Sequence, residues 1–152
     1  MSLTPANVRQ RIQSRIDGWG DVVVSQLPYD AYGLGTDQIA HRRVAVGLLA
    51  TSTNEGRQRA GAVHCKSDVR VRYGYRMKPL EAQASAYDEA LDWGLGLVRR
   101  LLTDSADTPW PGPMRISFVS QNSTTDPAGE WFLGDLHFDV AHAVVLGDFP
   151  TS

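Results

Sequence analysis

The chain has a single cysteine, Cys65, among its 152 residues, so it cannot form an intramolecular disulfide. We therefore expect a protein that is made in a reducing compartment, where thiols remain free. Neither sign of charge dominates, because 15 Lys and Arg residues stand against 17 Asp and Glu residues and the formal net charge is −2. This balance excludes a generic polyanion binder, and any contact with nucleic acid would depend on a local basic patch.

Long apolar runs are also missing. No segment approaches the 18 consecutive apolar residues that indicate a membrane span. The N-terminal stretch MSLTPANVRQRIQSRI has no apolar h-region, so we expect no secretion signal. There is no internal repeat and no low-complexity segment. The hydrophobic fraction of 42% and the charged fraction of 21% are ordinary for globular proteins. The chain is therefore predicted to form one domain over residues 1–152.

Familiar catalytic and nucleic-acid-binding motifs are not found. The glycine-rich segment Gly33–Asp37 lacks the Lys-Ser/Thr pair of a phosphate loop, and no G-x-S-x-G elbow occurs. Cys65 follows His64 in an expected strand, where adjacent side chains point apart and do not form a nucleophile–base pair. No RNP motif, zinc finger or basic recognition helix is present. We predict no catalytic residue and no cofactor site.

The C-terminal segment GEWFLGDLHFDVAHAVVL, residues 129–146, raises the question of a metal site. Strand side chains alternate between the two faces of a sheet. This alternation puts His137 and Asp139 together on a polar face and His142 on the opposite, apolar face. Two ligands are too few for a structural zinc site. We therefore predict no metal here, and we expect His142 to lie inward or at the strand end with one hydrogen-bond partner.

Two amphipathic helices are predicted. The first begins with Thr4 as the N-cap and Pro5 at the first helical position, and it ends near Gly18. Its apolar stripe consists of Val8, Ile12 and Ile16 and is extended by Trp19. The second helix begins at Pro79. Its predicted stripe consists of Leu80, Ala84, Tyr87, Leu91, Leu95, Val98 and Leu102. Gly94 and Gly96 in its middle predict close packing against a sheet.

Between and after the helices the sequence alternates as strands do. We expect strands at 21–26, 41–50, 67–77, 114–120 and 130–146, loops at 27–38 and 51–62, and a turn at 121–129. The fold class is therefore α+β: a two-layer sandwich with a mostly antiparallel sheet and both main helices on one face. We expect the main core to consist of Tyr73, Tyr75, Leu91, Ile116, Phe118, Leu136 and Phe138.

The arginines offer candidate assembly contacts. Arg70, Arg72 and Arg76 share one face of a strand, while Arg57 and Arg59 lie on the loop before it. Two interpretations remain open. One is a solvated face whose cross-strand salt bridges contribute little to stability. The other is a patch that faces a phosphate or a partner. In the second case the 51–61 loop is an assembly contact and not a folding element.

The order of these parts resembles a known family. An amphipathic helix precedes the strand HRRVAVGL and the hairpin loop TSTNEGRQRAG; the strand VRVRYGYRMKP then leads into EAQASAYDEALDWG, and the chain ends with EWFLGDLHFDVAHAVVL. This arrangement resembles the tail terminator and head–tail joining proteins of long-tailed bacteriophages and related gene transfer particles, over most of the chain from Val8 to Leu146.

The resemblance implies a virion structural protein without catalytic residues. It is made in the host cytoplasm and forms a homo-oligomeric ring, expected to be a hexamer, in the neck region. The ring caps the tail tube, contacts a head-side connector and lets DNA pass through its lumen without sequence preference. No membrane partner is implied. Two alternatives remain: another phage neck, connector or tail-completion protein, and a small metal-dependent or hydrolytic enzyme that uses His137, Asp139 and His41.

Overall fold

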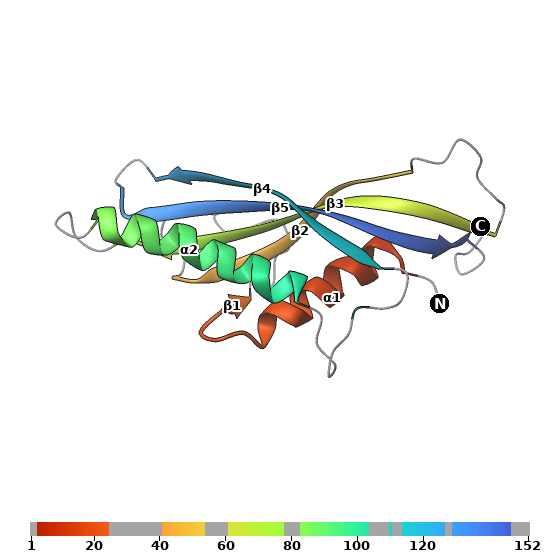
Figure 1. Ribbon diagram of the computed structural model, residues 1–152, viewed down its shortest axis with the longest axis horizontal. Helices are drawn as coiled ribbons and strands as arrows, with labels where there is room; N and C mark the ends of the chain where they lie inside the picture. Colours follow the sequence, from red (N-terminus) through yellow and green to blue (C-terminus); the bar gives the residue numbers. More distant parts are fainter. Residues whose placement is uncertain are drawn as a thin grey trace.

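The protein forms two layers, a twisted sheet and a pair of helices that lie across one of its faces (Figure 1). The computed structural model describes residues 3–24, 41–53, 61–77, 83–103, 110, 114–126 and 129–146. The predicted loop at 27–38 and the predicted helix start at Pro79 lie outside these residues. Among the described residues no helix is long and apolar enough to span a membrane. The α+β fold class is confirmed.

The sheet has five strands in the order β1-β2-β3-β5-β4. Short β1 (Val23–Val24) runs parallel to β2 (Arg43–Ser52), and all other neighbours are antiparallel. At the centre, β3 (Ala62–Arg76) and β5 (Trp131–Val145) pair over their full length. The outer strand on the far side is β4 (Arg115–Thr125). Both predicted hairpins, β2–β3 and β4–β5, are therefore present.

Several strand ends differ from the prediction, and β3 begins at Ala62 instead of at residue 67. β2 continues through Thr51 and Ser52, which pair with Ser67 and Lys66, so the loop after it is shorter than expected. β4 continues through Thr125, whereas a turn was predicted at 121–129. The polar composition of these segments suggested loops, but each is a strand end that borders solvent and needs no apolar side chains.

Strands β2 and β4, the outer neighbours of the central pair, each carry one bulge, and both bulges flank the same row of the sheet. Leu48, Val69, Phe138 and Phe118 are laterally aligned across β2, β3, β5 and β4. The register shifts directly after Leu48 in β2 and directly after Phe118 in β4. Because a bulge increases the local twist, this pair of bulges accounts for the strong twist of the long strands in Figure 1.

The first helix, α1 (Pro5–Asp17), agrees with the prediction. Thr4 caps it by accepting a hydrogen bond from the backbone N–H of Asn7, and Gly18 follows its last turn. Val8, Ile12 and Ile16 are fully buried against the sheet layer. In front of the helix, the backbone N–H of Leu3 donates to Ala143 O, which joins this segment to β5.

The second helix, α2 (Gln83–Leu102), is rotated relative to the prediction. Its buried residues are Ala86, Ala90, Gly94, Leu97, Val98 and Leu101. Leu80 lies outside the described residues. Of the remaining members of the predicted stripe, only Val98 is buried and Leu91 is partly buried, while Ala84, Tyr87, Leu95 and Leu102 are exposed. The cause lies in the sheet, because Tyr73 rises from β3 and only small residues fit above it.

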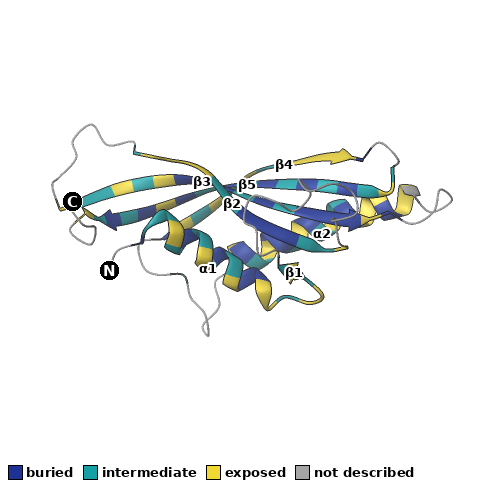
Figure 2. Ribbon diagram, turned by 180° about the vertical axis from the view of Figure 1, so that it is seen from behind, coloured by how far each residue is buried: buried dark blue, intermediate teal, exposed yellow. Residues whose placement is uncertain are grey.

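Most of the predicted core is confirmed. Tyr73, Tyr75, Leu136 and Phe138 are buried, and Leu91, Ile116 and Phe118 pack against this core while partly exposed. The alternation predicted for β5 is also confirmed, since its even-numbered residues from Phe132 to Val144 are all buried (Figure 2). The predicted inner faces of β3 and β5 are therefore confirmed.

Candidate functional site: the charged sheet face

The face of the sheet opposite the helices carries a cluster of charged side chains from the two central strands. Its members are Lys66, Asp68, Arg70 and Arg72 of β3 and Asp135, His137 and Asp139 of β5; we call it the charged face. Cross-strand register places Asp68 opposite Asp139, Arg70 opposite His137, and Arg72 opposite Asp135. The predicted placement of His137 and Asp139 on one polar face with the arginines is therefore confirmed.

Asp68 is at the centre of this cluster. Arg70 donates a hydrogen bond from Nε to Asp68 Oδ1 over 2.9 Å. His137 Nε2 lies 2.7 Å from the same oxygen, close enough for an ion pair but not aligned as a hydrogen bond. The hydrogen bond to Asp68, with the charges of Asp68 and Asp135, raises the pKa of Arg70 above its ordinary value, and burial partly opposes this.

The remaining members extend the network on both sides. Asp135 Oδ2 lies 3.7 Å from Arg70 Nη1 and 3.7 Å from Arg72 Nε. On the other side, Asp139 is 3.2 Å from Lys66 Nζ. Each carboxylate thus has at least one cation beside it, including the two that stand opposite each other, Asp68 and Asp139. Such a face resists binding of a simple anion, because its cations are already engaged.

For Arg70 and Arg72 this arrangement matches the first interpretation, a face with cross-strand salt bridges. Arg76 is exposed at the end of β3, where its backbone N–H donates to His41 Nδ1 over 3.0 Å. Arg57 and Arg59 lie outside the described residues, so their role as assembly contacts stays a prediction. The five candidate arginines therefore do not form one described patch.

Of the residues suggested for an enzyme, His137 and Asp139 lie together, with Nε2 3.4 Å from Oδ1, but His41 is distant from both. His41 lies beside Arg76, whereas His137 lies opposite Arg70. At about 3.3 Å per strand residue, these positions are roughly 20 Å apart along β3. Among the described residues, no three His, Cys, Asp or Glu side chains are grouped as metal ligands. The alternative site with His137, Asp139 and His41 is thus not assembled in the described part of the chain.

His142 lies on the opposite, helix-bearing face, as its position in β5 predicted. It is buried and has two partners where one was expected: Nδ1 is 2.7 Å from Leu3 O, and Nε2 is 2.7 Å from Ser67 Oγ. Ser67 Oγ is in turn 2.8 Å from Thr51 Oγ1. This chain of polar groups joins the N-terminal segment to β5, β3 and β2. No local sequence pattern predicts these contacts, because the partners are far apart in the chain.

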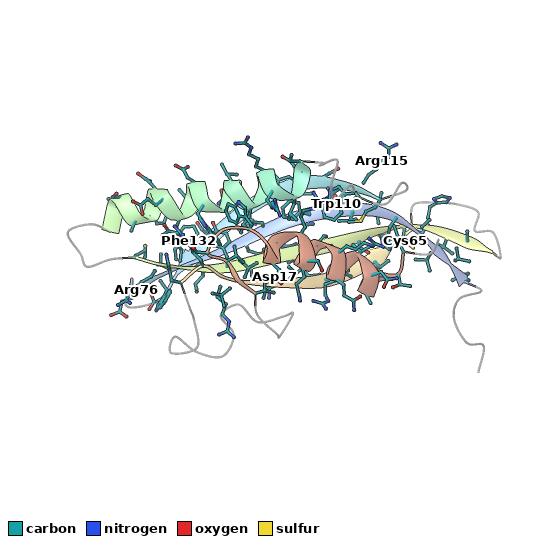
Figure 3. The ribbon with its side chains drawn as sticks, turned by 90° about the horizontal axis from the view of Figure 1, so that it is seen from below. Asp17, Cys65, Arg76, Trp110, Arg115 and Phe132 are labelled. Carbon is teal, nitrogen blue, oxygen red and sulfur yellow. The ribbon has the colours of Figure 1, made fainter. Side chains whose placement is uncertain are left out.

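Cys65 is paired in register with His142, a proximity that the local argument about His64 missed (Figure 3 labels Cys65). Both ring nitrogens of His142 are nevertheless occupied by Ser67 and Leu3. His142 therefore has no nitrogen left to act as a base toward the thiol. The conclusion that Cys65 is not part of a nucleophile–base pair holds, although for a different physical reason.

Tyr73 is the main polar group between the sheet and α2. Its hydroxyl donates to Ala90 O over 2.9 Å and accepts from Gln121 Nε2 over 3.1 Å. Burial raises the pKa of Tyr73 to about 12. A side chain at Gly94 would overlap the Tyr73 hydroxyl, so this glycine marks close packing against the sheet as predicted. Gly96 instead contacts Trp19, beyond the end of α1.

The sequence matches no protein-family model, and it shows no significant similarity to any curated protein. A function for this chain therefore has to be argued from its geometry together with the arrangement of its elements.

Proposed function

We propose that this chain is a subunit of a tail terminator, a ring that caps the tail tube of a long-tailed bacteriophage or a related gene transfer particle and joins it to the head connector. The support is the sequence of elements on which the resemblance rests. An amphipathic helix, the β2–β3 hairpin, a long helix and the β4–β5 hairpin follow one another in that order. The proposed ring is a hexamer with a lumen for DNA.

The observation that carries the proposal is that the polar groups of the sheet bond to one another within the chain. The charges of the charged face pair with one another, and the buried groups His142 and Ser67 bond to the chain itself. Groups that act on a substrate must be accessible and have a free donor or acceptor. Side chains used in this way favour a structural subunit over an enzyme.

A terminator ring needs a rigid body with separate surfaces for its neighbours, the tube and the connector. The long central pair β3–β5 spans the molecule, and both helices brace one side of it (Figure 1). The opposite face bears no helix among the described residues. This asymmetry suits a subunit that presents different surfaces in different directions.

The test is to delete the gene in cells that produce the particle and to examine their lysate by electron microscopy. Without a terminator, tube polymerisation has no stop, so we expect tails of irregular and excessive length and filled heads without tails. Expression of the intact chain from a plasmid should restore tails of uniform length. Tails of normal length that fail to attach to heads would instead indicate another neck or connector protein.

Metal analysis of the purified protein separates the structural role from the enzyme alternative. Because β5 puts His142 on the opposite face from His137 and Asp139, we expect no stoichiometric metal. A bound metal at one equivalent that is lost in both His137→Ala and His142→Ala would contradict the parity argument and the proposed structural role.

A further inference from the structure

The sheet ends in two outer edges that differ from each other. No described strand pairs with the outer side of β4. At the other edge, β1 pairs only with Arg43 and Val44, and Arg9 of α1 reaches Val46 O at 3.5 Å. Beyond Val46, the segment Leu48–Ser52 of β2 pairs with β3 on its inner side and has no strand on its outer side among the described residues.

Apart from Arg115 at the start of β4 and Arg9 beside Val46, both edges lack the residues that prevent strands from pairing between molecules. Proteins protect such edges with charged side chains or proline. In contrast, Ser117–Thr125 of β4 and Val44–Ser52 of β2 contain no Asp, Glu, Lys, Arg or Pro. Each edge also exposes one large apolar side chain at its bulge, Leu49 at 58% and Val119 at 48%.

The free backbone groups of β4 can be assigned from the hairpin. Asp126 N–H donates to Trp131 O at the turn, and bonded and outward-facing residues alternate along an antiparallel ladder. Gln121, Ser123 and Thr125 therefore direct their N–H and C=O groups away from β5. Five residues of β4 can thus receive a further strand over about 17 Å.

Helix α2 adds an apolar wall next to this edge. Gln121 donates to Leu91 O, and the Tyr87 hydroxyl is 3.5 Å from Ser123 Oγ, so α2 runs alongside β4. On this flank of the helix, Tyr87, Leu95 and Leu102 are 37%, 48% and 44% exposed. A strand that joined β4 would place every second side chain against this wall.

We propose that the two edges bind each other between copies of this chain: the β4 edge of one subunit, with the apolar flank of α2, receives the Leu48–Ser52 edge of β2 from the next. The inference rests on the proposed ring function and specifies its interface. β2 and β4 run in opposite directions within the sheet. A neighbour in the same orientation therefore continues the antiparallel alternation across the boundary.

A second copy is the occupant that the molecule itself favours. The chain supplies both halves of the contact, uncharged on both sides, each with an exposed apolar residue at a bulge. Because the two halves are different surfaces, the contact is head-to-tail, and repeated head-to-tail contacts form a ring when the rotation between neighbours closes and an open filament when it does not. Pairing of β4 with another β4 would leave the β2 edge unused.

Two variants disable the β4 side. Ser123→Pro removes an N–H that points outward, at a position where an edge strand tolerates proline. Leu95→Glu places a charge on the apolar flank of α2. Their controls are Ser123→Ala, which keeps the N–H, and Ser85→Glu. Ser85 precedes buried Ala86, whereas Tyr87 follows it, so Ser85 lies on the flank of α2 that faces away from β4. Leu49→Lys disables the β2 side.

Oligomeric state is measured by native mass spectrometry and light scattering, and circular dichroism checks the fold of each variant. We expect the intact chain and both controls to form a closed ring, and Ser123→Pro, Leu95→Glu and Leu49→Lys each to lower the oligomer fraction at least tenfold. An equimolar mixture of Ser123→Pro and Leu49→Lys should form a heterodimer and nothing larger, because each contributes the one edge that remains intact.

Three outcomes would overturn the inference. The first is that rings persist in Ser123→Pro and Leu95→Glu, and the second is that the intact chain stays monomeric at all concentrations. The third is that Leu49→Lys forms dimers in the absence of Ser123→Pro, which would mean that β4 pairs with β4. Each can occur while the gene deletion still gives overlong tails, so failure of the interface and failure of the proposed function are distinguishable.

Discussion

Tyr73 shows how one side chain determines the packing of a whole helix. Its ring is fully buried and its hydroxyl reaches Ala90 O and Gln121, so the helix above it must be built from small residues. Gly134 beneath it on β5 is required for the same reason, because a Cβ there would overlap the ring. Two glycines on different elements thus enclose one tyrosine.

Ionisation of this buried hydroxyl predicts a loss of stability in alkali. The pKa of Tyr73 is raised to about 12 from an ordinary value of 10.0. Because the pKa of Tyr73 is higher in the folded than in the unfolded chain, the protonated hydroxyl contributes to stability. This contribution is fully present below pH 10 and is lost as the pH rises through 12. The difference corresponds to roughly 2–3 kcal/mol. Urea unfolding of the intact chain should show this decline.

Tyr73→Phe is the matched variant for this measurement. It should cost about 1–2 kcal/mol at neutral pH through the lost hydrogen bonds. Between pH 10 and 12 its free energy of unfolding should fall less steeply than that of the intact chain. Equal slopes for the two proteins would show that the hydroxyl is not protected from ionisation.

The two histidines of β5 lie on opposite faces of the sheet, and we expect their substitution to affect stability differently. His142→Ala leaves Leu3 O and Ser67 without their buried partner and opens a cavity, so it should cost about 2–4 kcal/mol. His137→Ala, on the charged face, should cost less than about 1 kcal/mol. Thermal unfolding of both variants checks this, and similar losses would contradict the assigned faces.

At the scale of elements, the strands were predictable and the rotation of α2 was not. Alternation within β3 and β5 determines which side chains point inward, because the period of a strand is local information. In α2, apolar residues occupy two adjacent flanks, and Leu95 is displaced by about 100° from Gly94. Only the position of Tyr73 decides which flank is buried, and this depends on a contact distant in sequence.

The polar chain through His142 was unpredictable for the same reason. Leu3, Ser67 and His142 come from three elements, and no local pattern connects them. The charged face was predictable in part: the parity of Arg70 and His137 was correct, but their pairing with Asp68 depends on the cross-strand register. Polar segments of β4 were taken for a turn because exposed strand ends resemble loops in composition.

The rotation of α2 predicts that alanine substitution of two adjacent leucines lowers the free energy of unfolding by very different amounts. Leu101 is fully buried, whereas Leu102 is exposed at the end of the helix. Leu101→Ala should lower the free energy of unfolding by about 2–5 kcal/mol, and Leu102→Ala by less than about 0.5 kcal/mol. Chemical denaturation of the two variants provides the comparison. A larger loss for Leu102→Ala would restore the stripe predicted from the sequence.

At the scale of the whole molecule, the proposed assembly would use other surfaces than those that stabilise the fold. The core draws on both helices and the four long strands, and the charged face is balanced within the sheet. We propose that partners bind the two outer edges and the connection between β2 and β3, where Arg57 and Arg59 occur in the sequence. Bidentate pairing of these arginines with carboxylates of a neighbour would add register to an interface held by backbone bonds.

Shortening the connection between β2 and β3 tests whether it serves assembly and not folding. Residues 54–60 are replaced by a four-residue turn, and in a second variant Arg57 and Arg59 alone become Ser. Pairing of Ser52 with Lys66 anchors the hairpin in both, so the thermal midpoint of the monomer should stay within a few degrees. If the arginines are assembly contacts, joined particles should decline sharply in both variants, as counted by electron microscopy. Normal numbers of joined particles would remove this segment from the interface, and unfolding of the shortened monomer would mean that it belongs to the core.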